Sequence, residues 1–173
     1  MWDQSKVDIP KDHRVTILNG LILVMIIGSF IYSIVSYSSL PDRIPIHFNA
    51  RGEADNWGHP GFIFIIQIIS LPGCLIVYAL SRMPSLHNYS TIKVTKENAP
   101  KLYALSRLFL TVINFQVVLL ITYSSWEMIQ ISKGSGNFGG WIFKFLIGAL
   151  LVTVCVFYVK IHKFKKQNNL TDE

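Results

Sequence analysis

The sequence predicts an all-α integral membrane bundle of four transmembrane helices with an ordered extracellular loop. Three observations predict this fold: long stretches of the chain carry no charged residue, basic residues gather beside those stretches, and one connecting segment is dense in turn-forming residues. A helix needs about 20 apolar residues to cross the hydrocarbon core of a bilayer. The charge-free stretches lie between Arg14 and Asp42, between Asp55 and Arg82, between Arg107 and Glu127, and between Lys144 and Lys160.

Each charge-free stretch predicts one helix, and together they make residues 1–173 a single membrane domain. We expect helices over residues 15–37, 61–82, 105–131 and 141–160. The fourth stretch is the shortest, so it spans a bilayer only if Trp141, Ile142 and Phe143 join it and the Lys144 side chain extends to the interface. The first apolar stretch is longer than the core of a signal peptide, which predicts an uncleaved first helix.

The distribution of lysine and arginine predicts the orientation. Twelve of the 16 basic residues fall on one side of a four-helix topology: Lys6, Lys11, Arg14, Arg82, Lys93, Lys96, Lys101, Arg107, Lys160, Lys163, Lys165 and Lys166. Basic segments stay in the cytoplasm, so we expect a bacterial cell-membrane protein with both termini cytoplasmic. These residues all lie beside apolar runs, which indicates contact with the lipid bilayer and argues against binding of nucleic acid.

The loop over residues 38–60 has the most specific pattern in the chain. Pro41 and Pro45 restrict the backbone of their neighbourhood to extended geometry. The apolar residues Ile44, Ile46 and Phe48 alternate with Pro45 and His47, which predicts an extended segment with one apolar face. Asn49 to Gly52 favours a turn in which Gly52 takes a positive φ. We expect this loop to be ordered and to cover the outer mouth of the bundle.

The pattern L-P-x-x-I-P-x-H-F-N-x-x-G-x-x-D in this loop resembles a family of small multi-pass bacterial membrane proteins of largely uncharacterised function. The same element occurs in the N-terminal region of SdpI-type immunity proteins, which protect cells from a secreted killing peptide. The matching positions are Leu40, Pro41, Ile44, Pro45, His47, Phe48, Asn49, Gly52 and Asp55. The resemblance implies sensing of, or resistance to, an extracellular antimicrobial peptide. An extracellular peptide and a membrane or regulatory protein are the candidate partners.

The candidate ligand-binding residues are therefore those of the motif loop, with Trp57 added as an exposed aromatic residue beside polar groups. They are Pro41, Pro45, His47, Phe48, Asn49, Gly52, Asp55 and Trp57. Two other roles stay open for the polar residues of the loop. His47, Asp55 and His59 have side chains that suit a metal ion, although their spacing matches no standard site. Alternatively, His47 forms a hydrogen bond within the loop and the acidic residues pair with Arg43 and Arg51.

Enzymatic motifs are missing from the sequence. It contains no G-x-S-x-G, no HExxH, no P-loop and no dinucleotide fingerprint. We therefore expect a protein that is not an enzyme and that needs no cofactor.

A few polar residues fall inside the predicted helices, and they favour an alternative function. Asn114, Gln116 and Gln67 are amides at membrane depth, where such groups link helices together. Glu127 lies near the outer end of the third helix, and we expect it to anchor at the interface, where Lys144 or a loop arginine is in reach; a role in a site is the alternative. The amides motivate the alternative that the protein is a small membrane transporter or a transporter subunit, in which Asn114 or Gln116 is required for flux.

Overall fold

The computed structural model describes residues 4–49, 51–89, 92–135 and 139–169. Its α-helices are α1 (His13–Tyr37), α2 (Phe62–Arg82), α3 (Ala99–Ser132) and α4 (Trp141–Asn169). A β-hairpin of β1 (Ile44–Phe48) and β2 (Ala54–Gly58) joins α1 to α2, and short 3-10 turns cover Gln4–Lys6 and Pro84–Leu86. Within the described ranges, four helices are long and apolar enough to cross a membrane. This confirms the predicted all-α membrane bundle.

Two helices are longer than the sequence predicted. α3 begins at Ala99 rather than at residue 105, because Pro100 fits the first turn of a helix and the preceding residues form a reciprocal turn. In that turn the Thr95 N–H donates to Oδ1 of Asn98 (2.9 Å) and the Asn98 N–H donates to Oγ1 of Thr95 (3.3 Å). α4 continues to Asn169 rather than ending at residue 160. Its lysine-rich last turns favour helix and complement the negative end of the helix dipole.

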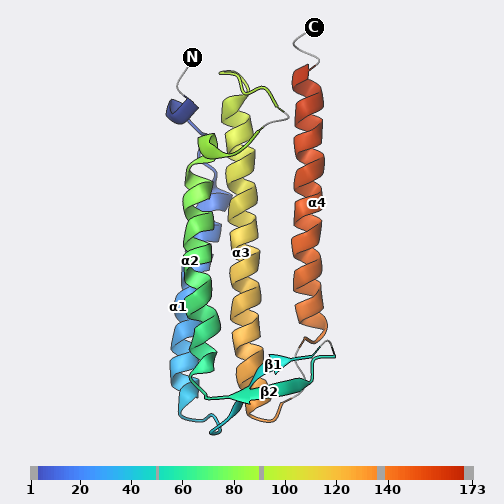
Figure 1. Cartoon of the computed structure of the whole chain (residues 1–173). Helices are drawn as coiled ribbons and strands as arrows, with labels where there is room; N and C mark the ends of the chain where they lie inside the picture. The colour runs from blue at the N-terminus through green and yellow to red at the C-terminus, as the bar shows by residue number, and fades with distance from the viewer. Residues whose placement is uncertain (1–3, 50, 90–91, 136–138, 170–173) are drawn as a thin grey trace.

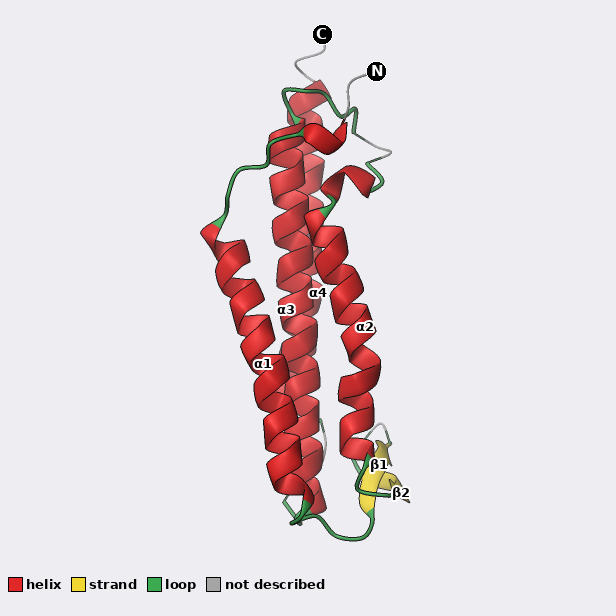
Figure 2. Cartoon of the chain, turned by 90° about the vertical axis from the view of Figure 1, so that its left-hand side faces the viewer, coloured by secondary structure: helices red, strands yellow, loops and turns green. Residues whose placement is uncertain are grey.

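The central element of the bundle is α3, which contacts each of the other three helices. α1 and α2 lie to one side of α3 and α4 lies to the other (Figure 1). In the turned view, α1 and α2 stand on either side of α3 (Figure 2), in keeping with the slight contact between them. The start of α1 and the end of α4 lie at one end of the bundle, and the hairpin lies at the opposite end (Figure 1). This is the arrangement that an even number of spans requires.

The fourth helix packs along the outer side of α3. The rings of Phe109 and Phe157 stack with their centroids 3.8 Å apart. Nε2 of Gln116 donates to Oγ1 of Thr153 (2.9 Å) and to the carbonyl oxygen of Ala149 (3.3 Å). None of the described side chains of α4 is buried. α4 is therefore a peripheral helix, whose contacts with α3 include a ring stack and an amide.

The interior of the bundle is more polar than its outer surface. Buried polar side chains on the first three helices are Ser29, Ser33, Ser36, Gln67, Ser81, Ser106, Thr111, Asn114, Ser124, Ser125 and Glu127. The exposed positions of the same helices carry large apolar side chains such as Ile17, Val24, Ile34 and Ile69. Lipid tails are as apolar as leucine, so membrane helices associate through small residues and interhelical hydrogen bonds rather than through apolar burial. The outer surface is therefore the surface that contacts the lipid bilayer.

Candidate functional site

The motif loop folds as an antiparallel β-hairpin. Asn49 organises its turn: the Asn49 N–H donates to the Glu53 carbonyl oxygen (2.9 Å), and Oδ1 of Asn49 accepts from the N–H groups of Arg51 (2.8 Å) and Glu53 (3.1 Å). Gly52 has a φ of 81°, a conformation that L side chains rarely adopt. The predicted turn and the positive φ of Gly52 are therefore confirmed, and the asparagine and glycine of the motif have a structural reason.

The hairpin is fixed to the bundle by its first strand. Ile44 is fully buried in one cluster with Ile63 of α2 and Ile129 of α3. Half-buried apolar residues around this cluster are Tyr32, Leu40, Ile46, Phe64 and Met128. Because this cluster contains residues of β1, α2 and α3, with Tyr32 of α1 packed against it, the hairpin is part of the fold and not a free loop.

The expected alternation along β1 is only partly correct. Ile44 is buried, but Pro45 is buried as well, so successive side chains do not simply point to opposite faces. The strand register has irregularities between Pro45 and His47 and between His47 and Phe48. Proline cannot donate to a strand ladder, and such positions favour bulges. The extended segment with an apolar face is therefore confirmed, and the buried Pro45 and the irregular register are its departures from a simple period of two.

The exposed face of the hairpin carries a set of polar contacts. Nδ1 of His47 lies 2.5 Å from Oδ1 of Asp55, and Nδ2 of Asn49 donates to Oε2 of Glu53 (2.8 Å). Nη2 of Arg43 donates to the carbonyl oxygen of Trp57 (2.8 Å). The predicted hydrogen bond of His47 within the loop is present. The expected pairing of the acidic residues with Arg43 and Arg51 is not what forms, because Asp55 and Glu53 face His47 and Asn49 across the short turn.

These contacts sort the candidate binding residues into two groups. Pro45 and Gly52 are buried, and the Asn49 side chain is engaged in the turn, so these three shape the hairpin. Pro41, His47, Asp55 and Trp57 are exposed. Phe48 is half-buried and lines the groove described below. A ligand can therefore reach the exposed residues and Phe48, and the buried ones hold them in place.

The three candidate metal ligands do not form one group, although His47 and Asp55 lie side by side. Over the described parts of the chain, no three His, Cys, Asp or Glu side chains form a group that could hold a metal ion. Nδ1 of His59 instead accepts a hydrogen bond from the N–H of Gly61 (3.0 Å), at the start of α2. His59 thus has a local role in the chain's entry into the helix.

A groove beneath the hairpin was not predicted from the sequence. Its volume is about 400 Å³, and its walls come from the hairpin and three helices. The lining residues are Ile46 and Phe48 of the hairpin, Phe62, Ile65 and Ile66 of α2, Leu120, Ile121, Ser124 and Met128 of α3, and Phe143 of α4. In Figure 1 the hairpin lies at the end of the bundle near α3 and the start of α4. The motif loop therefore forms one wall of an apolar groove whose other walls are transmembrane helices.

Glu127 has different partners from the ones expected. It is 7 % exposed and accepts hydrogen bonds from the Tyr123 hydroxyl (3.4 Å) and from the N–H groups of Gly139 (3.3 Å) and Gly140 (3.5 Å). Those N–H groups immediately precede α4. A carboxylate is stabilised at the N-terminus of a helix, so Glu127 joins the start of α4 to α3 and does not pair with Lys144 or a loop arginine.

The matched family covers this part of the chain. Residues 24–71 match the family described as Domain of unknown function (DUF1648). No curated protein and no solved structure matches the chain. The matched range runs from the middle of α1 through the whole hairpin to Leu71 of α2, so it contains the motif loop and two walls of the groove. The chain is thus a membrane protein with several spans that carries a DUF1648 segment.

Proposed function

We propose that the protein is a non-enzymatic membrane protein that binds a membrane-active peptide at its hairpin and so senses or resists it. The observation that carries this proposal is the groove of about 400 Å³ between the hairpin and α2, α3 and α4. Ligand sites are concave and mostly apolar, with a few polar groups that fix orientation. The groove supplies the apolar part of such a site, and the hairpin beside it supplies the polar part.

The chemistry of the two surfaces suits an amphipathic peptide. The groove is lined almost entirely by isoleucine, leucine, methionine and phenylalanine. The hairpin exposes the His47–Asp55 pair and the ring of Trp57. Tryptophan is enriched at binding hot spots and at membrane interfaces, where one side is apolar and the other wet. A peptide that enters the outer leaflet can place its apolar side chains in the groove and its polar backbone along the hairpin.

The distribution of charge supports an extracellular hairpin. The twelve basic residues named above lie in the N-terminal segment, between α2 and α3 and their adjoining turns, and at the end of α4, away from the hairpin. Under the positive-inside rule the hairpin then faces outward. The resemblance of the motif to the N-terminal region of SdpI-type immunity proteins supports the same assignment, in the cell membrane of a bacterium. A membrane or regulatory protein partner would distinguish the peptide-free state of this site from the peptide-bound state.

A growth test decides between this proposal and a purely structural hairpin. Cells with the wild-type gene, a deletion, and the variants His47→Ala, Asp55→Ala and Ile66→Trp are challenged with a panel of membrane-active peptides. Ile66→Trp fills the groove without touching the polar face. Lys96→Ala, an exposed change at the opposite end, is the control. Membrane levels of each variant are measured by immunoblot.

We expect wild type and Lys96→Ala to protect, and the three site variants to lose protection at normal membrane levels. Equal growth of the deletion strain and wild type against every peptide would remove the proposal. The hairpin would then be a folding element of the bundle.

Transport is the second candidate function, and one observation favours it. Two cavities between α1, α2 and α3 share Ile26, Leu71 and Cys74 in their walls, with Gln67 in the wall of one cavity and Asn114 in the wall of the other. Solute flux into proteoliposomes tests it. Transport predicts that Asn114→Leu abolishes flux while His47→Ala leaves it intact, and peptide binding predicts the reverse pattern in the growth test. Gln116 is a less direct candidate, because its amide is engaged between α3 and α4.

A further inference from the structure

The cavity between α1 and α2 has a volume of about 250 Å³ and reaches α3 at its floor. Its walls are Asn19, Ile22, Leu23 and Ile26 of α1, Leu71, Cys74, Leu75 and Tyr78 of α2, and Asn114 of α3. α1 and α2 stand on either side of α3 (Figure 2), and residues of all three helices line the cavity. The outward-facing wall residue Leu75 is 64 % exposed, on the lipid-facing surface. This wall of the cavity therefore lies at the surface that faces the bilayer.

The floor of the cavity holds a hydrogen-bond acceptor without a donor. Asn114 is 3 % exposed, and its Nδ2 donates to the carbonyl oxygen of Cys74 (3.2 Å). A carbonyl oxygen only accepts, so this bond fixes which side of the amide carries the nitrogen. Oδ1 of Asn114 is then left buried with no partner in the described structure. A buried acceptor without a donor costs about 1–3 kcal/mol, and a ligand that donates to Oδ1 recovers this loss.

The lining of the cavity restricts the donor to a neutral group. None of the nine lining residues is Asp, Glu, Lys, Arg or His. A charged ammonium or metal ion would lack a counter-charge at membrane depth, which is costly. A hydroxyl group donates one hydrogen bond and accepts others, and the amide of Asn19 in the same wall is a donor for its oxygen. The remaining walls are mainly isoleucine and leucine, which suit an apolar body.

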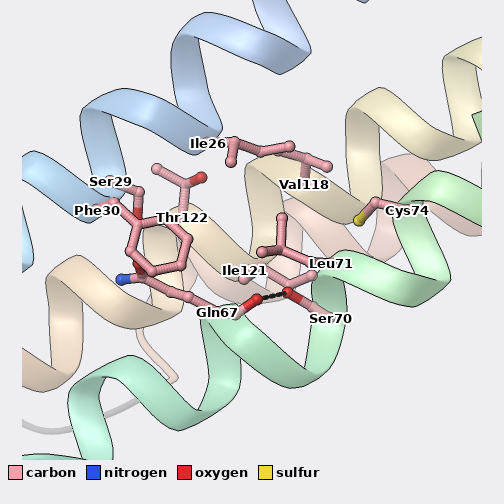
Figure 3. Close-up of a pocket in the computed structure, with 10 residues that line it drawn as sticks. All are labelled: Ile26, Ser29, Phe30, Gln67, Ser70, Leu71, Cys74, Val118, Ile121 and Thr122. Atoms are coloured by element: carbon pink, nitrogen blue, oxygen red, sulfur yellow. Dashed lines mark hydrogen bonds between the residues drawn. The ribbon is translucent and has the colours of Figure 1, made fainter.

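A second, smaller cavity marks where the ligand stops. It adjoins the first through Ile26, Leu71 and Cys74 and has a volume of about 20 Å³, which is room for one water molecule. Figure 3 shows Gln67 and Ser70 of α2, Ser29 of α1 and Thr122 of α3 around it. Oε1 of Gln67 is also buried without a partner there. This chamber suits a single water and is too small for the ligand.

We infer that a neutral, lipid-soluble molecule with a hydroxyl group binds between α1 and α2 and donates its hydroxyl hydrogen to Oδ1 of Asn114. This site is separate from the groove at the hairpin and does not rest on peptide binding. Its occupant is defined by its chemistry, an apolar chain with one alcohol, whether it comes from a bilayer lipid or from a dissolved small molecule.

Photolabelling of the full chain in lipid nanodiscs tests the inference. The probe is octanol that carries a diazirine on its chain, and the matched control is octane with the same diazirine. Labelled residues are identified by mass spectrometry of peptides, with and without excess unlabelled octanol. Two further sets of nanodiscs distinguish a lipid occupant from a dissolved one. One contains diacylglycerol, which has a free hydroxyl, and the other contains triacylglycerol, which has none.

We expect the alcohol to label the α1 and α2 residues of the cavity, with labelling blocked by octanol and at least about tenfold weaker for the alkane, the factor that corresponds to 1.4 kcal/mol. Competition by diacylglycerol against labelling indicates a lipid occupant. Competition by octanol without competition by diacylglycerol indicates a dissolved one. Both results support the site. Equal labelling by alcohol and alkane, or labelling spread evenly over the lipid-facing surface, overturns it.

Two variants locate the donor's partner. Asn114→Leu removes the acceptor and is expected to lower labelling about tenfold, whereas Gln116→Leu is the control. Gln116 is also on α3 and also has a buried Oε1 without a partner, but its amide bonds to α4. Leu75→Trp fills the cavity from an exposed position without breaking a hydrogen bond, so it decides the question if Asn114→Leu does not insert. Unchanged labelling in Leu75→Trp overturns the inference.

Discussion

His47 and Asp55 face each other across the hairpin with Nδ1 and Oδ1 only 2.5 Å apart, although the strand register places His47 opposite Asn56. The irregularities on both sides of His47 bring the carboxylate alongside the ring. The side chains are 67 % and 44 % exposed, so water weakens their attraction. The pair therefore fixes the direction of two exposed side chains more than it stabilises the fold.

A double-mutant cycle measures this relationship. We expect His47→Ala and Asp55→Ala each to increase hydrogen exchange of the hairpin amides, and the double variant to exchange no faster than the worse single one. The coupling should be about 0.2–1 kcal/mol, as for other exposed pairs. Additive effects in the double variant would mean that the two side chains act separately.

Gly52 offers a test of the turn. Its φ of 81° costs an L residue about 1–2 kcal/mol, so Gly52→Ala should raise hairpin exchange by a corresponding factor. Gly52→Asn is the matched control, because asparagine tolerates this conformation better than alanine. Equal effects of the two substitutions would show that the strain lies elsewhere in the turn.

The sequence alone predicted the helices because their signal is compositional. Stretches without charge predict spans whatever the partners of each helix are. The turn at Gly52 was also predictable, since only local chemistry decides it. The extra turns of α3 and α4 lie outside the apolar stretches, where capping and helix propensity decide the ends and hydropathy carries no signal.

The groove and the role of Glu127 were not predictable in the same way. Both depend on which helices lie side by side: Phe143 and Phe48 reach one groove from distant parts of the chain. Glu127 meets Gly139 and Gly140 because the outer end of α3 lies beside the start of α4. The charge of Glu127 suggested a basic partner, whereas the structure supplies backbone N–H groups. Polar residues at membrane depth were the available signal. They indicated which side chains form interactions inside the bundle, but not which groups those side chains contact.

Asp12 makes the start of α1 sensitive to acid. Its carboxylate caps the helix by accepting from the Arg14 N–H (2.9 Å), and the side-chain hydrogen bond from Arg14 lowers the pKa of Asp12 below its usual 3.8. Because the folded pKa is depressed, this contribution to stability is present above the unfolded pKa and is lost as pH falls through the folded pKa. Asp12→Ala should cost about 1 kcal/mol near neutral pH.

Hydrogen exchange measures the stability of this cap at two amides. The N–H groups of Val15 and Thr16 both donate to the Asp12 carbonyl oxygen. We expect the difference between wild type and Asp12→Ala to shrink below pH 3.8, the unfolded value. Asp12→Asn keeps an acceptor without the charge, so its exchange should lie between the two near neutral pH. A difference that is the same on both sides of that pH would contradict a role for the charge.

Ser33 and Gln67 test how the polar interior stabilises the bundle. Nε2 of Gln67 donates to Oγ of Ser33 (2.7 Å), and Oε1 of Gln67 has no partner in the described structure. Ser33→Ala leaves the whole amide unpaired and should cost about 1–3 kcal/mol. Gln67→Leu removes donor and acceptor together, so it should cost less or even stabilise.

Unfolding in SDS, followed by far-ultraviolet circular dichroism, compares the two variants in the same detergent. Interhelical hydrogen bonds in membranes average about 0.6 kcal/mol, so the order of the two variants is more informative than either size. A larger loss for Gln67→Leu than for Ser33→Ala would mean that the glutamine has a partner, such as a bound water in the small cavity, that outweighs the bond to Ser33.

Glu127 should control how firmly α4 begins. The N–H groups of Gly139 and Gly140 have this carboxylate as their acceptor, and α4 otherwise packs along α3 without a buried side chain in the described structure. Glu127→Ala should therefore destabilise the α3–α4 connection by about 1–3 kcal/mol, because it leaves donors at the helix start without a partner. Glu127→Gln keeps one acceptor oxygen and should have an intermediate effect. Hydrogen exchange of the first turn of α4 measures this effect, and Glu97→Ala is the exposed control at the far end of α3. If Glu127→Ala changes exchange no more than Glu97→Ala does, water already satisfies those donors. α4 is then held by its contacts with α3 alone.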